Sequence, residues 1–126
     1  MPNQVQELHG KRALVYAADG PLLRKGQDAS DLISEARSAD ATIAVLPTAR
    51  LDPAFFDLKT GIAGEMVQKF VNYGLKVAIV GDTSELAAKS KALHDFIYES
   101  NRRGSVWFLT NQQELDERLS RDAVAK

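Results

Sequence analysis

The sequence has no cysteine and only two histidines among its 126 residues. Without cysteine the chain forms no disulfide, no cysteine-based zinc site and no thiol nucleophile, and it suits a reducing cytosol. Long apolar runs are absent as well. None approaches the roughly 20 residues of a membrane span, and the first residues lack the basic and apolar regions of a signal peptide. We therefore expect a cytoplasmic protein that does not associate with membranes.

Neither sign of charge dominates, because sixteen basic and seventeen acidic side chains leave a formal net charge of −1. Such a balance provides no field that would hold a nucleic-acid backbone, so we predict no nucleic-acid partner. An apolar share of 44% and a charged share of 26% are typical of a globular protein. The length fits a single domain over residues 1–126.

Two short strand-like runs open the chain, residues 4–8 and 13–17. The turn between them, His9–Arg12, contains Gly10, and together they predict an antiparallel hairpin. Later runs are almost wholly apolar, which is typical of parallel strands buried on both faces. These runs are residues 42–46, 77–80 and 106–109.

Amphipathic helices are expected between and after the buried strands, because apolar residues recur there at helical spacing. They cover residues 28–36, 60–73, 82–103 and 111–119, and in the third we expect Leu86, Leu93, Phe96 and Ile97 to be buried. The order is β-β-α-β-α-β-α-β-α. It predicts an α/β fold with one mixed sheet, in which an N-terminal antiparallel hairpin is followed by parallel βαβαβα units.

Two loops that lead into helices are candidate anion sites, since a helix start presents free backbone amides and the positive end of the dipole. The first consists of Lys59, Thr60 and Gly61, and the second of Asp82, Thr83 and Ser84. Both follow buried strands and could face one crevice at the carboxyl ends of the sheet. The structural alternative is that these residues only cap helices and allow close backbone passage.

Candidate partner surfaces are the aromatic pair Phe55 and Phe56 with Asp57, and the basic pair Arg102 and Arg103. Aromatic residues outside a core usually mark binding, and the arginines would hold an acidic partner. The alternatives are that the two phenylalanines fill the core and that the arginines complement the negative end of a helix dipole.

No catalytic or metal-binding constellation is evident, and we predict neither a metal nor a cofactor. His9 and His94 are too few and too isolated for a metal site. Ser84, His94 and Asp95 contain the residue types of a catalytic triad, but neighbouring helix residues point in different directions and no nucleophile-elbow pattern is present.

Three blocks of sequence, residues 55–70, 77–82 and 95–102, resemble a small bacterial family catalogued only as a domain of unknown function. The resemblance covers nearly the whole chain, and the family brings no established activity with it. In element order the chain is also similar to STAS domains, the sulfate transporter and anti-sigma antagonist group. That similarity implies partner binding and a phospho-acceptor at Thr60 before Gly61, although Leu58 stands where those domains have an acidic residue.

Two hypotheses follow. The first is a non-enzymatic, STAS-like regulatory or interaction module whose partner is a regulatory protein or a second copy of the chain. The second is a ligand-binding protein or an enzyme that takes a small ligand or a nucleotide phosphate in the crevice between the Thr60 loop and residues 81–84.

Overall fold

Five strands form one sheet whose spatial order, β1-β2-β3-β4-β5, is the order of the chain. The computed structural model describes residues 3–103 and 105–124. β1 runs antiparallel to β2, and each later strand is parallel to its predecessor. The mixed sheet predicted from the sequence is confirmed. The strands are β1 Gln4–Leu8, β2 Lys11–Val15, β3 Ile43–Pro47, β4 Lys76–Val80 and β5 Val106–Leu109.

The hairpin turn is tighter than predicted. Only His9 and Gly10 lie between the paired residues Leu8 and Lys11, and both have positive φ angles, 51° and 81°. Two left-handed residues in a two-residue turn match the twist of the flanking strands. β2 therefore begins at Lys11, two residues before the predicted start.

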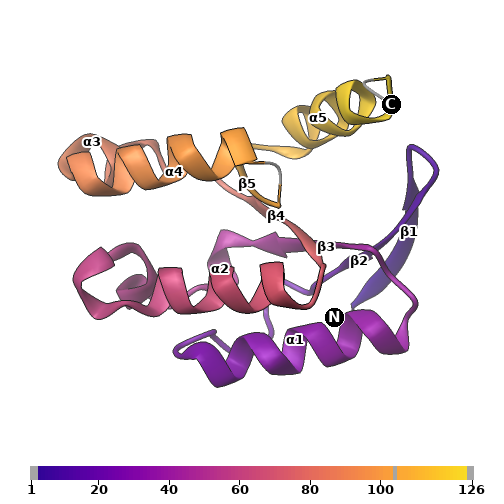
Figure 1. Ribbon diagram of the computed structural model, residues 1–126, viewed down its shortest axis with the longest axis horizontal. Helices are drawn as coiled ribbons and strands as arrows, with labels where there is room; N and C mark the ends of the chain where they lie inside the picture. Colours follow the sequence, from indigo (N-terminus) through magenta and orange to yellow (C-terminus); the bar gives the residue numbers. More distant parts are fainter. Residues whose placement is uncertain (1–2, 104, 125–126) are drawn as a thin grey trace.

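Three helices cover one face of the sheet and one covers the other (Figure 1). α1 (Gly26–Ser38), α2 (Ile62–Asn72) and α4 (Lys91–Arg103) share a face, because right-handed crossovers that each advance by one strand place every connecting helix on the same side. α5 (Gln112–Val124) lies on the opposite face, where Leu115 and Leu119 are fully buried. No described helix is long and apolar enough to cross a membrane.

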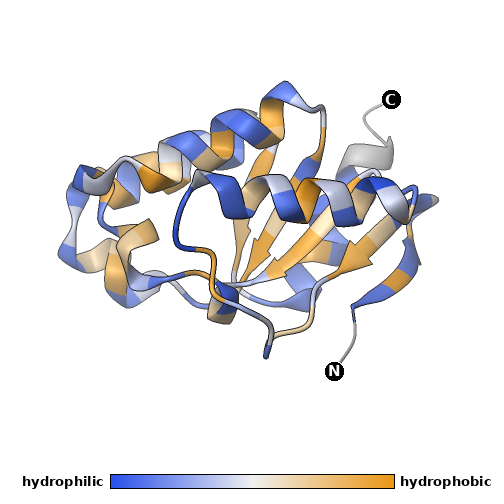
Figure 2. Cartoon of the chain, turned by 90° about the horizontal axis from the view of Figure 1, so that it is seen from below, coloured by the Kyte–Doolittle hydropathy of each residue, from blue (hydrophilic) through white to orange (hydrophobic). Residues whose placement is uncertain are grey.

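Alternate residues of each parallel strand enter the two core layers. On β5, Phe108 packs towards α4, whereas Trp107 packs towards α5 with the Arg118 guanidinium 4.5 Å from its ring centroid. The strands are accordingly apolar on both faces, while α1 and α2 alternate between apolar and polar residues (Figure 2). The predicted double burial of the parallel strands is confirmed.

The predicted third helix is two helices, α3 (Ser84–Lys89) and α4. Ser90 interrupts them in an extended conformation, with φ −142° and ψ 109°, and its hydroxyl accepts a hydrogen bond from the Leu93 amide at 3.1 Å. A serine that caps a new helix competes with helix continuation. α3 has no buried residue, so the expected burial of Leu86 was wrong: its side chain is 43% exposed.

Asn101 on α4 occupies backbone groups of the edge strand β5. Its amide oxygen accepts a hydrogen bond from the Phe108 N–H at 2.7 Å, and its amide nitrogen donates to the Phe108 carbonyl at 3.3 Å. The contact imitates one step of strand pairing and blocks that position against another strand. The β5 edge of the sheet is thus closed to an added strand at Phe108.

Replacing Asn101 with alanine should lower the unfolding free energy by about 1–3 kcal/mol, because two backbone groups lose their partner. Urea unfolding measures the change, and light scattering shows whether the opened edge promotes association. Asn72→Ala on the exposed end of α2 is the matched control, expected within about 0.5 kcal/mol of the parent. Equal stability of both variants would contradict this role for Asn101.

Candidate functional site

Arg50 is the one buried charged residue among the described residues, with only 6% of its surface exposed. It ends the short 3-10 turn η1 (Thr48–Arg50) that follows β3. Its Nε donates to the Pro21 carbonyl at 2.7 Å and one Nη to the Ala17 carbonyl at 2.9 Å. Both acceptors are neutral, and no carboxylate of residues 3–103 or 105–124 lies within ion-pair distance of the guanidinium.

Gly20 allows the guanidinium to occupy this position. A Cβ atom at residue 20 would stand 2.6 Å from the guanidinium carbon of Arg50, closer than any real contact. The backbone after β2 therefore lies directly against the charged group. Leu23 completes the junction: its amide donates to the Arg50 carbonyl at 2.7 Å and its carbonyl accepts from the Asp52 amide at 3.1 Å.

A cavity of about 400 Å³ opens beside Arg50 at the carboxyl edge of β2 and β3. In Figure 1 this edge lies towards the end of the molecule where α1, α2 and α4 begin. Its lining combines apolar residues of the loop after β2 with carboxylates of α1. The lining residues are Asn3, Ala17, Gly20, Pro21, Leu22, Leu23, Asp28, Asp31, Leu32, Glu35 and Arg50.

Tyr16 lies beneath the site, 1% exposed, and its hydroxyl donates to the Leu32 carbonyl at 2.6 Å. Burial raises the pKa of this hydroxyl above its usual value, and the Glu35 carboxylate raises it further. Tyr16 therefore stays neutral at physiological pH and fixes α1 against β2. That contact holds one wall of the cavity in place.

Thr60 is a capping residue in this structure. Its hydroxyl donates towards the Ala54 and Asp57 carbonyls at 2.9 and 2.8 Å and accepts from the Ile62 amide at 3.3 Å. Gly61 has a φ of 77° and ends the 3-10 turn η3 (Leu58–Thr60) before α2 begins. Lys59 is exposed, and its amide donates to the Asp57 carboxylate at 3.2 Å.

The second predicted anion loop follows β4. The Asp82 carboxylate accepts a hydrogen bond from the Ser84 amide at 2.9 Å, and hydrogen bonds from Ser84 lower the pKa of Asp82. Thr83 is the N-cap residue of α3 without a side-chain capping bond. A Cβ at Gly81 would stand 2.0 Å from Thr48 Oγ1, so the space beside Gly81 is filled by the first residue of η1 and not by the Thr60 loop.

The candidate partner residues fall into two environments. Phe55 is 1% exposed and meets Phe56 edge to face at 5.1 Å, so it belongs to the core, and Phe56 packs against it half-buried. The exposed Asp57 caps the following turn through the Lys59 amide. Arg102 is exposed and paired with Glu99 at 3.2 Å, and the side chain of Arg103 lies outside the described residues.

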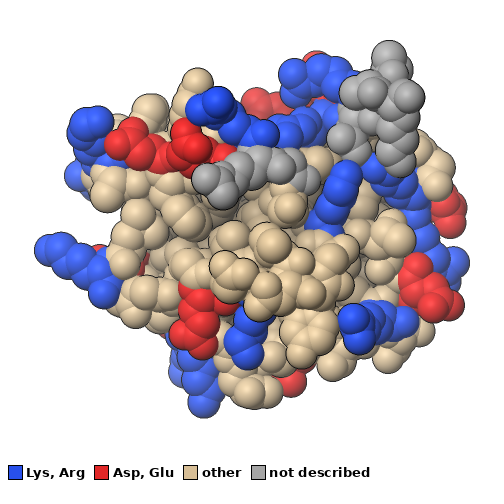
Figure 3. Space-filling view, viewed as in Figure 1, with Lys and Arg blue, Asp and Glu red and all other residues tan. Residues whose placement is uncertain are grey.

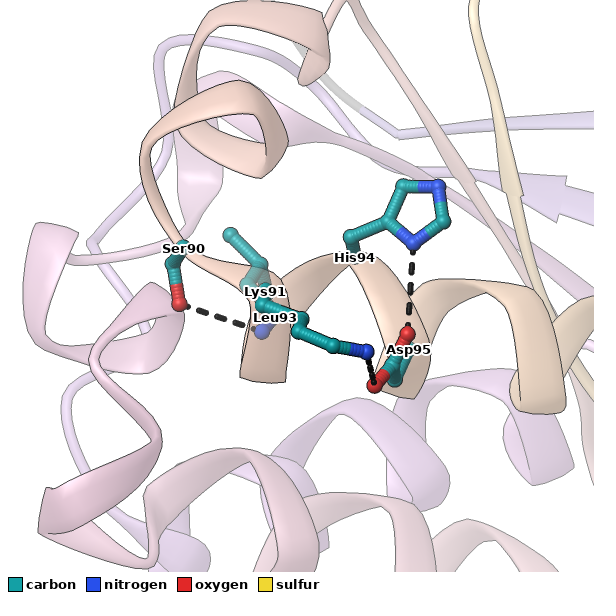
Figure 4. Close-up of polar contacts among 5 residues, drawn as sticks. All are labelled: Ser90, Lys91, Leu93, His94 and Asp95. Atoms are coloured by element: carbon teal, nitrogen blue, oxygen red, sulfur yellow. Dashed lines mark hydrogen bonds and ion pairs between the residues drawn. The ribbon is translucent and has the colours of Figure 1, made fainter.

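His94 and Asp95 lie together on the surface of α4, beside Lys91 (Figure 4). The Asp95 carboxylate lies 3.3 Å from His94 Nδ1 and 3.3 Å from Lys91 Nζ, and the hydrogen bonds from both lower its pKa. Ser90, the serine seen nearby, uses its hydroxyl on the Leu93 amide. Among the described residues no group of three histidine, aspartate or glutamate side chains could hold a metal ion.

A second hollow, of about 670 Å³, lies between α2 and α4, and apolar side chains such as Val67, Val71 and Phe96 line it together with polar ones such as Gln68 and Glu99. Val71 is 46% exposed. Figure 3 shows uncharged side chains gathered between these helices, with lysine, arginine and carboxylates around them. This groove is separate from the Arg50 cavity, with which it shares no lining residue.

Sequence reasoning missed Arg50 because nothing local distinguishes it. Arg50 lies in a loop shortly after Pro47, a setting in which most arginines are exposed. Its guanidinium is buried against Gly20, which lies thirty positions earlier in the sequence. Neither predicted loop, Lys59–Gly61 or Asp82–Ser84, contributes to the Arg50 cavity. The cavity lies at the carboxyl ends of β2 and β3, whereas the ligand-binding hypothesis placed its crevice between the Thr60 loop and residues 81–84.

These features define an α/β protein with one mixed sheet and a buried arginine beside a cavity at its carboxyl edge. The model of the family described as "Domain of unknown function (DUF4180)" matches residues 8–119, and the chain belongs to this family. The family resemblance inferred from the sequence blocks is thereby supported. No curated protein and no solved structure matches the chain.

Removing the Thr60 hydroxyl tests whether it acts as a cap. Thr60→Val should lower the unfolding free energy by about 1–2 kcal/mol, because the turn before α2 loses the bonds of its hydroxyl. Thr60→Ser keeps the hydroxyl and should stay close to the parent in urea unfolding. A valine variant as stable as the serine variant would show that the hydroxyl is free for another role.

Proposed function

We propose that this domain is a non-enzymatic binding module that holds a small molecule by an anionic group in the Arg50 cavity. The observation that carries the proposal is the guanidinium of Arg50, 6% exposed and bonded only to two neutral carbonyl oxygens. A carboxylate or phosphate is the natural counter-ion, because guanidinium presents a fork of donors that matches either group.

The energetic argument is that a buried charge without a directly paired counter-ion is costly. The Asp19 carboxylate interacts with Arg50 electrostatically but forms no ion pair with it. Arg50 has five N–H donors, and its two hydrogen bonds to described residues use Nε and one Nη, so donors remain for a ligand. A purely structural role, tying the loop after β2 to η1, would explain the two carbonyl bonds. It leaves the choice of a charged side chain and the adjoining cavity unexplained.

The sequence suggested a regulatory role in the bacterial cytoplasm by analogy with STAS domains, and we keep that role as part of the proposal. Ligand occupancy would then alter what the domain binds. In this account Thr60 is not the switch, because phosphorylation would replace the hydrogen through which its hydroxyl caps the turn.

A second candidate function is protein docking in the groove between α2 and α4. The supporting observation is the apolar lining, with Val71 46% exposed at its rim. Exposed apolar patches that are surrounded by polar residues often mark protein interaction sites. A regulatory protein or a second copy of the chain would be the partner, and Val71→Asp should abolish its binding without affecting the Arg50 cavity.

Arg50→Met separates a binding role from a structural one. We expect its unfolding free energy to change by no more than about 1 kcal/mol, since two lost hydrogen bonds are offset by removal of an unpaired buried charge. A loss above roughly 3 kcal/mol would identify Arg50 as a structural tie. Chemical denaturation measures the difference.

Ligand binding itself is measured by thermal shift with a panel of carboxylates, amino acids and phosphorylated metabolites. A ligand at 100 times its Kd stabilises by about 2.7 kcal/mol, which raises the Tm by on the order of 8 °C for a chain of this length. The shift should vanish in Arg50→Met and persist in Arg102→Met, a matched surface variant. If no compound shifts the parent, the binding proposal is wrong.

A further inference from the structure

We propose that the ligand of the Arg50 cavity is a zwitterion, a molecule with an ammonium group as well as a carboxylate, of the class to which free amino acids belong. This inference rests on the proposed function and specifies its ligand. The carboxylate would meet Arg50 at the buried end of the cavity. The ammonium group would meet Asp31 and Glu35 on α1 at its open end.

The charge of the lining favours this class over a simple anion. Among the described residues that line the cavity are three carboxylates, Asp28, Asp31 and Glu35, and one cation, Arg50. A phosphate ester or a dicarboxylate would approach Arg50 past an excess of negative charge, which like-charge repulsion disfavours. A molecule with both signs of charge satisfies the two ends together.

The three carboxylates differ in their availability. Asp28 Oδ2 accepts from the backbone amides of Arg24 and Lys25 at 2.7 and 3.2 Å, so this side chain serves as a cap. Glu35 Oε2 accepts from the Asn3 amide at 2.7 Å and leaves its other oxygen unused. Asp31 has no hydrogen bond or ion pair to any described residue.

Asp31 and Glu35 stand one helical turn apart on α1, so their side chains lie on the same face. Both are exposed, whereas Arg50 is buried, which orders the cavity from an outer negative end to an inner positive end. Leu23 and Leu32, which are 3% and 2% exposed, also line the cavity. These leucines suit an apolar side chain of the bound molecule.

The size of the cavity also fits a small molecule. Its volume of about 400 Å³ is near the lower end of the range for ligand pockets, roughly 300–1,000 Å³. Hydrogen bonds link the two ends of the cavity: Asn3 donates to Glu35 and accepts from the Ala17 amide, and the Ala17 carbonyl accepts from Arg50. This short connection suits a free amino acid, whose two charged groups are close together.

Isothermal titration calorimetry with matched compounds tests the inference. The probes are the twenty proteinogenic amino acids with 4-aminobutanoate, their counterparts in which the ammonium is replaced by hydroxyl or hydrogen, and the amines that lack the carboxylate. At least one zwitterion should bind about tenfold more tightly than both of its counterparts, the difference expected of one charge-assisted hydrogen bond.

Variants then assign the two ends. Asp31→Asn and Glu35→Gln should each reduce the preference for the zwitterion over its deaminated acid by about tenfold, while Arg50→Met should abolish binding of both. Glu117→Gln on the exposed face of α5 is the control and should change nothing. Circular dichroism confirms that each variant is folded.

The outcomes separate this inference from the proposal on which it rests. If deaminated acids or phosphorylated compounds bind as well as the zwitterions, and Asp31→Asn strengthens them, the zwitterion is overturned and anion binding at Arg50 stands. If amines bind and Arg50→Met leaves them unaffected, or if no probe of any class binds, both fail.

Discussion

The direction of the parallel crossovers is the constraint on which the rest of the structure depends. Each crossover advances the sheet by one strand, so α1, α2 and α4 share one face and α5 alone covers the other. Doubly wound sheets form their ligand crevice where the strand order reverses, and β2 to β5 contain no such reversal. Any site at the carboxyl edge must therefore be built from loops and a helix start, as the Arg50 cavity is.

Arg50 is the residue through which this fold presents a charged group to the cavity. The loop after β2 is held against η1 by the guanidinium and by the Leu23 backbone, and Gly20 makes the close approach possible. The charged group is thus fixed by two segments that follow neighbouring strands. Its hydrogen-bond partners are carbonyls and not carboxylates, and the Asp19 carboxylate acts on it electrostatically without forming an ion pair. A carboxylate or phosphate of a ligand would therefore supply the direct pairing that Arg50 lacks.

Strong, repeated patterns made most of the fold predictable. The buried strands that end at Pro47, Val80 and Leu109 appear where continuous apolar runs predicted them. The break at Ser90 was missed because the helical pattern continues through it, and only the hydroxyl contact with Leu93 shows that a new helix begins. Arg50 was missed for a different reason, since its environment is assembled from segments distant in sequence, and no local pattern reports such a meeting.

The most direct test of the account is an NMR titration that includes the arginine Nε–H resonances, with an equimolar mixture of amino acids and small carboxylates as the added ligand. The account predicts that the Arg50 Nε–H signal and the amides of Gly20 and Leu23 shift first and saturate together. Shifts confined to Thr60, Gly61 and Asp82–Ser84, or to the groove around Val71, would contradict it and move the binding site to those residues.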